Sequence, residues 1–261
     1  MEPILQIQQL KKNYGSNEVL KGIDLDVYPG QIIGYIGPNG AGKSTTVKMI
    51  LGLEQDYLGD ISLFGKNIKD DPINYKRRVG YVPEMAELYD ALTAHEYLTF
   101  IGELYGMDFE TTDQKAKQLF SVFNMEHVYN ARISSFSKGM KQKLLIVSSM
   151  LHNPDILFLD EPINGLDANS VMIFKEILAQ LANAGKTIFY SSHIMDVVEK
   201  ISTRIVIIND GQIVTDGTFS EIKQQQKDGK GSLEEIFNKV TGFNDQKQRA
   251  DEFISIVTEV K

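Results

Sequence analysis

The chain has 261 residues, a formal net charge of −8 and no cysteine, which excludes disulfides, zinc-thiolate sites and cysteine nucleophiles. It is 42% hydrophobic and 24% charged, as soluble proteins are, and apolar runs such as 205–208 are far too short to span a membrane. The acidic balance disfavours nucleic-acid binding, and the first residues lack the basic and apolar segments of a signal peptide, so we expect a cytoplasmic protein.

Short strands dominate the first third of the chain. Residues 4–10 and 23–27 alternate apolar and polar side chains, as half-buried antiparallel strands do, and 61–64 lead into a Gly-Lys-Asn turn. Residues 32–36 are nearly all apolar and indicate a buried strand, and 79–82 form a further short strand. We therefore expect a small antiparallel sheet beside a buried core.

A candidate phosphate-binding loop follows the strand at 32–36. Residues 37–45 match G-x-x-x-x-G-K-[ST], a pattern whose glycines let successive backbone N–H groups surround phosphate oxygens. Residues 45–51 have apolar side chains at helical spacing, so the loop caps the positive end of a helix. Lys43 is placed to hold the β- and γ-phosphates, and Ser44 to face Mg²⁺. The predicted nucleotide-binding loop is Gly37, Pro38, Asn39, Gly40, Ala41, Gly42, Lys43, Ser44 and Thr45.

The middle of the chain changes to helical spacing. Apolar residues recur at helical intervals between 85 and 152, which predicts a helical insert. Two short apolar runs, 156–159 and 187–190, then indicate central parallel strands of a βαβ unit, and 205–208 with 212–214 indicate a hairpin. One predicted helix face in the insert consists of Tyr97, Leu98, Ile101, Leu104 and Tyr105.

Two carboxylates and a histidine follow the apolar runs. Asp160 and Glu161 come directly after 156–159, where the first is placed to hold Mg²⁺ and the second to polarise a water that attacks the γ-phosphate. His193 follows 187–190 at the carboxyl edge of a parallel sheet, where ligands bind in open α/β folds. The predicted catalytic residues are therefore Lys43, Glu161 and His193. The alternatives are an exposed acidic turn and a structural histidine.

The end of the chain becomes polar. Residues 223–231 indicate a solvated linker, and Ser232 with Glu235 forms a capping-box pattern at the start of a tail helix. The apolar stripe of this helix either packs on its own domain or docks to a partner. The stripe consists of Leu233, Ile236, Phe237 and Val240.

Together these motifs resemble the ATP-binding subunit of an ABC transporter, over about residues 4–217. The resemblance implies an α/β fold: a P-loop NTPase core with a mainly parallel central sheet, a flanking antiparallel β subdomain and an inserted α-helical subdomain. It implies an ATP-binding domain over 1–217, with its helical subdomain at 85–152, and a polar linker and C-terminal helical extension over 218–261. An aromatic residue ahead of the core stacks on adenine in that family, and Tyr14 matches it, supported by Val19.

The second diagnostic loop of that family, L-S-G-G-Q, is matched imperfectly by residues 136–140, ahead of a helix expected to begin near Lys141. By resemblance, Ser137 and Gly139, with Lys138 between them, contact the γ-phosphate held by the other protomer of a head-to-tail dimer. Lys138 and Met140 depart from the commonest pattern and are familiar in a branch that resembles ABC-2-type exporters.

Two further positions carry expectations from the resemblance. The family generally has a glutamine that contacts Mg²⁺ and links the site to the membrane subunit where this chain has Glu84. A carboxylate can still ligate Mg²⁺, so Ser44, Glu84 and Asp160 are the predicted metal residues, although Glu84 adds negative charge. Asp167 lies in a loop that faces the partner protomer; alternatively, it caps the following helix.

The resemblance implies an ATPase that uses ATP and Mg²⁺, pairs with a second ATPase protomer in a homodimer or a heterodimer, and drives a separate integral membrane permease. We expect it at the inner face of the cell membrane, held by the permease, with no membrane insertion of its own and no nucleic-acid partner. The residues at 84 and 136–140 and the short tail favour an exporter. The alternatives are a soluble ABC ATPase of an assembly complex, of the iron-sulfur type, and a nucleic-acid or ribosome-associated ABC ATPase.

Overall fold

The computed structural model describes residues 1–85, 87–225, 231–242 and 246–258. One of its two sheets is antiparallel and has the strand order β2-β1-β4-β5. This sheet confirms the antiparallel pattern predicted from the first third of the chain, although its first two strands are longer than expected and meet in a hairpin. Its strands are β1 (Leu5–Tyr14), β2 (Asn17–Val27), β4 (Leu58–Leu63) and β5 (Lys66–Asn67).

The second sheet forms the centre of the molecule and has the strand order β10-β9-β3-β8-β7-β6. Its pairs are parallel except for the β9-β10 hairpin, so the predicted mainly parallel sheet is confirmed. The carboxyl ends of β3, β7 and β8 lie at one edge, where the chemistry predicted from sequence is concentrated. The strands are β3 (Ile32–Ile36), β6 (Val79–Val82), β7 (Ile156–Asp160), β8 (Thr187–Ser191), β9 (Arg204–Asn209) and β10 (Gln212–Gly217).

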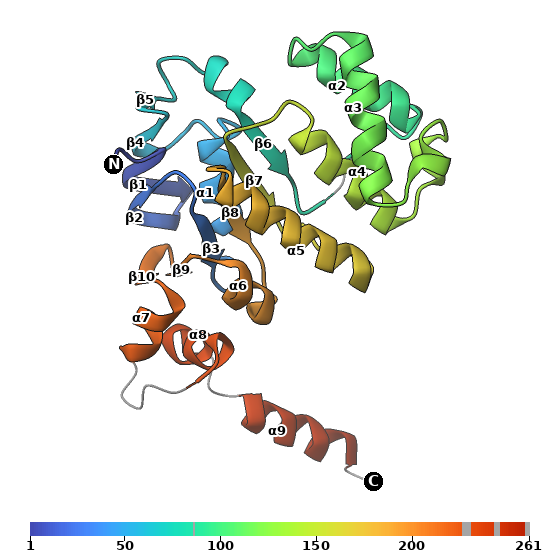
Figure 1. The fold of residues 1–261 in the computed structure, drawn as a ribbon. Helices are drawn as coiled ribbons and strands as arrows, with labels where there is room; N and C mark the ends of the chain where they lie inside the picture. The colour runs from blue at the N-terminus through green and yellow to red at the C-terminus, as the bar shows by residue number, and fades with distance from the viewer. Residues whose placement is uncertain (86, 226–230, 243–245, 259–261) are drawn as a thin grey trace.

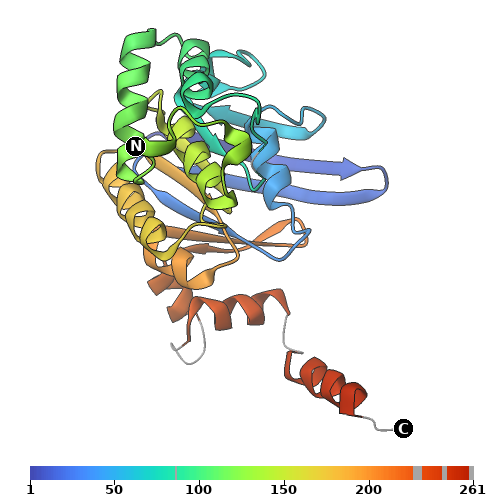
Figure 2. The ribbon, with the colours of Figure 1, turned by 90° about the vertical axis from the view of Figure 1, so that its right-hand side faces the viewer.

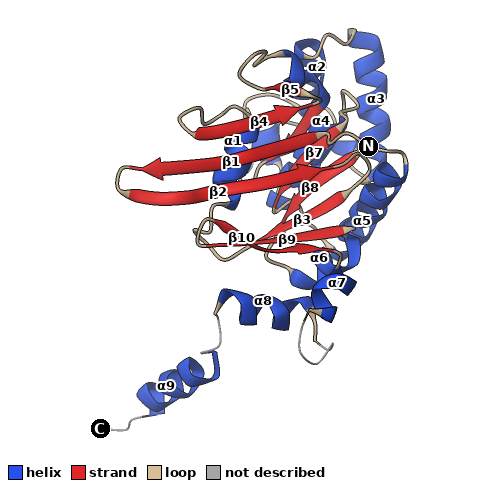
Figure 3. Ribbon diagram, turned by 90° about the vertical axis from the view of Figure 1, so that its left-hand side faces the viewer, coloured by secondary structure: helices blue, strands red, loops and turns tan. Residues whose placement is uncertain are grey.

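The inner strands β3, β7 and β8 of the central sheet are buried on both faces, and side chains of β3 show how. Ile33 and Tyr35 pack toward the antiparallel sheet and α1 (Lys43–Ile50), whereas Ile32 and Ile36 pack toward the other helices. This alternation explains why the run is apolar throughout, because a strand with both faces covered needs no polar side. Figure 3 shows α5 (Ala168–Asn183) and α6 (Met195–Ile201) to the right of the strands, whereas α1 lies among them.

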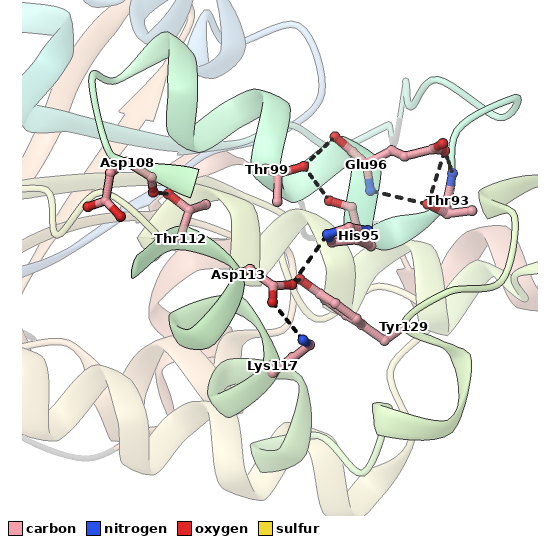
Figure 4. Close-up of polar contacts among 9 residues, drawn as sticks. All are labelled: Thr93, His95, Glu96, Thr99, Asp108, Thr112, Asp113, Lys117 and Tyr129. Atoms are coloured by element: carbon pink, nitrogen blue, oxygen red, sulfur yellow. Dashed lines mark hydrogen bonds and ion pairs between the residues drawn. The ribbon is translucent and has the colours of Figure 1, made fainter. Parts of the chain in front are cut away.

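Three helices form the insert at the upper right of Figure 1. They are α2 (Ala94–Leu104), α3 (Phe109–Val122) and α4 (Lys138–Met150), with short 3-10 turns at Glu126–Val128 and Ile133–Ser135; another, Asn74–Arg78, precedes β6. Asp113 of α3 accepts a hydrogen bond from Tyr129 Oη and contacts His95 of α2 (Figure 4). The predicted apolar face of α2 is not buried along its whole length, because Leu104, at the end of the helix, is 63% exposed.

The C-terminal region contains more helix than the sequence predicted. A capping box between Thr218 and Glu221 begins α7 (Phe219–Gln224), so the predicted linker at 223–231 is wrong at its start; residues 226–230 lie outside the described residues. The predicted tail helix is α8 (Leu233–Thr241), and its apolar stripe packs on its own domain. An additional helix, α9 (Gln246–Thr258), extends away from the body (Figure 2).

None of the helices described in residues 1–85, 87–225, 231–242 and 246–258 has the length and apolar character needed to cross a membrane.

Candidate active site

Two glycines of the loop between β3 and α1, Gly37 and Gly42, leave no room for a Cβ unless their neighbours shift. A Cβ on Gly37 would lie 2.3 Å from the carbonyl oxygen of Ile208, and one on Gly42 would lie 2.5 Å from Leu20 Cδ2. Gly42 also has a left-handed φ of 107° where α1 begins. The predicted phosphate loop therefore has close packing behind it and the N-terminus of α1 at its end, as anion binding requires.

The ammonium group of Lys43 folds back over this loop. Its Nζ donates to the carbonyl oxygens of Gly37 at 2.7 Å and Pro38 at 3.1 Å. Burial lowers the pKa of Lys43, and the nearby carboxylates of Glu161, Asp160 and Glu84 oppose that shift. A partly buried cation that is held only by neutral carbonyls is suited to exchanging them for phosphate oxygens.

A cavity of about 330 Å³ opens beside the loop. Ser44 Oγ donates to Asp160 Oδ2 across it at 3.2 Å, and burial raises the pKa of Asp160 while this hydrogen bond opposes the shift. The cavity is lined by Asn17, Val19, Asn39, Gly40, Gly42, Lys43, Ser44, Thr45, Glu84, Asp160 and Glu161. The structure thus brings the three predicted metal residues and two of the three predicted catalytic residues to one place.

The donor set in this cavity fits Mg²⁺. Ser44, Asp160 and Glu84 supply one hydroxyl and two carboxylates. Within the described part of the chain, no group of three or more His, Cys, Asp and Glu side chains is positioned to hold a metal by itself. Mg²⁺ characteristically uses one or two carboxylates together with substrate phosphates and water, so these residues suit a metal that arrives with a nucleotide.

Glu161 is held in a specific orientation at the cavity wall. It has a left-handed φ of 49°, unusual for glutamate, and is only 8% exposed. Ser192 Oγ donates to its Oε2 at 3.1 Å, and His193 Nδ1 lies 2.8 Å from its Oε1. The His193 side chain is 69% exposed, so the carboxylate is enclosed while its imidazole partner faces outward. Strained backbone of this kind is often found at functional sites. No sequence motif pointed to Ser192.

The two predicted adenine contacts lie at different places. Val19 lines the cavity, as does Asn17, which no motif indicated. Tyr14 is not among the lining residues; the residue is 48% exposed at the end of the hairpin, and its hydroxyl donates to Glu54 Oε2 at 3.1 Å. Lys12 Nζ lies 4.7 Å from the centre of its ring, so the ring and the hydroxyl both have partners within the chain.

The second diagnostic loop lies away from this cavity. Ser137, Lys138 and Gly139 do not line it; Ser137 caps α4 and accepts a hydrogen bond from the Met140 amide at 3.3 Å. The helix begins at Lys138, three residues earlier than expected, so its free N–H groups lie within the diagnostic loop itself.

Asp167 has the alternative role that the sequence left open: it caps α5, accepting from the backbone N–H of Ser170 at 2.9 Å and from its hydroxyl at 2.6 Å.

Glu84 is exposed and lies on the wall of two cavities. One is the cavity at the phosphate loop, and the other, of about 520 Å³, reaches Lys138 and Gln142 of α4. Glu84 is thus positioned between the P-loop and the helical insert.

Comparisons with known proteins give a consistent result. A family model described as "ABC transporter" matches residues 20–164. The chain is 36% identical over 219 residues to the linearmycin resistance ATP-binding protein LnrL of Bacillus subtilis (strain 168), covering 84% of this chain and 70% of that protein. It is 33% identical over 222 residues to the Nod factor export ATP-binding protein I of Cupriavidus metallidurans, covering 85% and 73%. A solved structure of an ATP-binding subunit of an ABC transporter superposes with a TM-score of 0.86 at 33% identity, covering 91% of this chain and 99% of that one.

Proposed function

This chain is an ATPase of the ABC transporter family, and we propose that it works as half of a dimer that closes over two Mg-ATP molecules, hydrolyses them and drives a separate membrane subunit. The observation that carries the proposal is the division of the predicted site. Lys43, Ser44, Asp160 and Glu161 share one cavity, whereas Ser137 lies outside it. A second chain placed head to tail would supply the missing residues.

Within one half-site, the roles follow from the contacts. Lys43 exchanges its two carbonyl partners for the β- and γ-phosphates, and the backbone N–H groups of the loop bind the remaining oxygens. Ser44, Asp160 and Glu84 hold Mg²⁺, which neutralises phosphate charge when it is bound. Tyr14 stacks on adenine and Val19 supports it.

Glu161 is the general base in this scheme. Its buried carboxylate, fixed by Ser192 and His193, polarises the water that attacks the γ-phosphate. His193 keeps the carboxylate aligned and contacts the γ-phosphate from the open side of the site. Phosphoryl transfer depends mainly on positioning and charge stabilisation, so the fixed orientation of Glu161 is as important as its basicity.

The partner chain completes each site. Ser137, Lys138 and Gly139 stand at the N-terminus of α4, where unpaired N–H groups and the helix dipole favour a phosphate. In the dimer they contact the γ-phosphate bound by the other protomer, and Asp167 faces that protomer as well as capping α5. The dimer is either a homodimer or a heterodimer with a related chain.

The membrane partner is proposed to be the permease of an exporter. The name of the Nod factor relative supports export, as does the exporter-like pattern at 136–140 and Glu84. The chain would lie in the cytoplasm at the inner face of the cell membrane, bound through the permease without inserting itself.

Purification from detergent-solubilised membranes tests the assignment to a transporter. We expect a tagged chain to be recovered with an integral membrane protein in a fixed ratio, and its ATPase rate to change when that protein is present. Recovery with soluble proteins alone would contradict the transporter and favour an assembly-complex ATPase. Stimulation of the ATPase by nucleic acid would also contradict it.

A further inference from the structure

A further cavity, of about 270 Å³, lies where the C-terminal end of α1 meets the segment from Tyr57 to Lys76. It shares no lining residue with the cavity at the phosphate loop, so the two are separate sites. We infer that this cavity binds a small organic carboxylate, held by two lysines and two tyrosine hydroxyls. The inference does not depend on the proposed dimer, because none of these four side chains has a role in it.

Two buried tyrosine hydroxyls at this cavity have no hydrogen-bond partner among the described residues. They belong to Tyr57 and to Tyr75, and Tyr75 is only 8% exposed. A Cβ on Gly52, which is part of the cavity wall, would lie 2.7 Å from Tyr75 Oη, so this hydroxyl reaches the wall. Buried hydroxyls in native proteins nearly always have a partner. A ligand that accepts hydrogen bonds would supply one.

Both hydroxyls keep their protons at neutral pH. Burial, with a smaller contribution from the neighbouring Tyr57, raises the pKa of Tyr75 to about 12. Burial also raises the pKa of Tyr57. A protonated phenol can donate to a ligand oxygen, so the two tyrosines favour a ligand that carries acceptor atoms.

Two lysines give the cavity a positive charge. Lys69 Nζ lies 4.3 Å from the centre of the Tyr57 ring, and Lys76 Nζ lies 5.8 Å from the centre of the Tyr75 ring. Lys69 Nζ donates to the neutral carbonyl oxygen of Gly59 at 3.4 Å. Neither lysine forms an ion pair in the part of the chain that the structure describes. Each ammonium group is therefore available to an anion beside one of the hydroxyl-bearing side chains.

Glu54 is an acidic residue of the cavity wall, but it does not cancel this positive charge. Its Oε1 accepts a hydrogen bond from Lys12 Nζ at 3.1 Å, and its Oε2 accepts one from the Tyr14 hydroxyl at 3.1 Å. Because Lys12 already compensates the carboxylate, the charges of the two cavity lysines remain for a ligand.

The rest of the wall indicates the size and class of the ligand. Met49 and Ile68 are buried apolar side chains of the wall, so the ligand should have an apolar body. The volume lies just below the roughly 300–1,000 Å³ of pockets for drug-sized ligands, which favours a body no larger than a single ring. The C-terminal end of α1 carries partial negative charge, which opposes a doubly charged phosphate more than a singly charged carboxylate. A small carboxylate with an apolar body therefore fits better than a phosphate.

The test measures the binding of benzoate and hexanoate to the full chain by saturation-transfer NMR, with and without saturating ADP. We expect both carboxylates to bind and to compete with each other, and ADP to leave their binding unchanged. Benzyl alcohol, which lacks the charge, and inorganic phosphate, which lacks the apolar body, should bind about tenfold more weakly.

Two substitutions locate the site. Lys76→Met should weaken benzoate binding about tenfold, as the loss of a hydrogen bond to a charged group does. The matched control is Lys48→Met, which removes an exposed lysine of α1 that does not line the cavity and should leave binding unchanged. Tyr75→Phe should weaken binding about fivefold without lowering the melting temperature, because its hydroxyl has no hydrogen bond to lose within the described structure.

Four results would overturn the inference. They are the absence of saturable binding by either carboxylate, the loss of benzoate binding when ADP is added, equal weakening by Lys76→Met and Lys48→Met, and a Tyr75→Phe protein that is less stable but binds benzoate as the wild type does. Tighter binding of phosphate than of benzoate would overturn the assignment to a carboxylate. None of these results bears on the proposed dimer, because the cavity shares no residue with the nucleotide site.

Discussion

The imidazole of His193 contacts the carboxylate of Glu161, with Nδ1 2.8 Å from Oε1. The contact joins the loop after β8 to the residue after β7, so two neighbouring strands of the central sheet determine where the proposed base points. Because Ser192 bonds the other carboxylate oxygen, both oxygens of Glu161 are oriented before a substrate arrives. The orientation of the proposed base therefore depends on two side chains, Ser192 and His193, which the segment after β8 carries.

Replacing His193 should impair the chemical step. We expect His193→Ala to lower kcat about 100-fold, the lower end of the range for loss of one group that stabilises charge in the transition state, with little change in the KM for ATP. Steady-state hydrolysis under Mg²⁺ saturation measures both parameters. His127→Ala, which changes an exposed histidine of the helical insert, is the matched control and should be silent. If His193→Ala hydrolysed ATP at a rate close to that of the wild type, His193 would have no role in catalysis.

Two glycines of the phosphate loop should respond differently to alanine. Gly37→Ala forces a Cβ against the Ile208 carbonyl oxygen and should destabilise the fold by about 1–3 kcal/mol. Gly40→Ala meets no atom within 4 Å, so only its left-handed φ of 81° opposes the change, at about 1 kcal/mol. Urea unfolding of the two variants compares them directly. If Gly37→Ala and Gly40→Ala had the same urea midpoint, the close packing behind Gly37 would not constrain the loop.

His152 should make stability fall in mild acid. Its Nε2 lies 3.0 Å from the Val79 carbonyl oxygen, its Nδ1 is buried without a partner in the described structure, and its ring stacks on Tyr105 with centroids 3.6 Å apart. Burial lowers the pKa of His152, and the charges of Lys115 and Lys186 lower it further. The unfolded chain therefore binds a proton more readily than the folded one. His152 therefore does not affect the free energy of unfolding well above its ordinary pKa of 6.5, and it lowers that free energy increasingly as the pH falls below 6.5.

The prediction for His152 is tested by urea unfolding of the wild type and of His152→Gln at pH 7.5 and at pH 5.5. The midpoint should fall less between these two pH values in His152→Gln than in the wild type, because the amide keeps a donor for Val79 but does not titrate. His127→Gln serves as the exposed control and should follow the wild type. An identical loss in all three proteins would mean that His152 does not contribute to the acid sensitivity.

Much of the fold could be predicted because the signals are local. Unbroken apolar runs at β7 and β8 indicate strands covered on both faces, and the residues that follow them must meet at the sheet edge. The sequence alone therefore predicts that Asp160, Glu161 and Lys43 lie near one another. Alternation of apolar and polar side chains likewise predicts the antiparallel sheet to which β1 and β2 belong, but not that these two strands form a hairpin.

Other features depend on tertiary contacts that periodicity does not report. Leu104 shares a helix face with buried residues but is 63% exposed, although its neighbours Gly102 and Tyr105 contact Thr112 and His152 at the same end of α2. The left-handed backbone of Glu161 and its bond to Ser192 arise from the packing of β7 against β8. Glu84 could be recognised as a departure, yet only the structure places it on the walls of two cavities.

The central claim is that two chains enclose two ATP molecules and that Glu161 is the base. The most direct test is light scattering of Glu161→Gln during size-exclusion chromatography. With Mg-ATP we expect twice the monomer mass, with two ATP molecules retained per dimer, and with ADP or no nucleotide we expect a monomer. A Glu161→Gln protein that stays monomeric with Mg-ATP and hydrolyses it at the wild-type rate would contradict both parts of the claim.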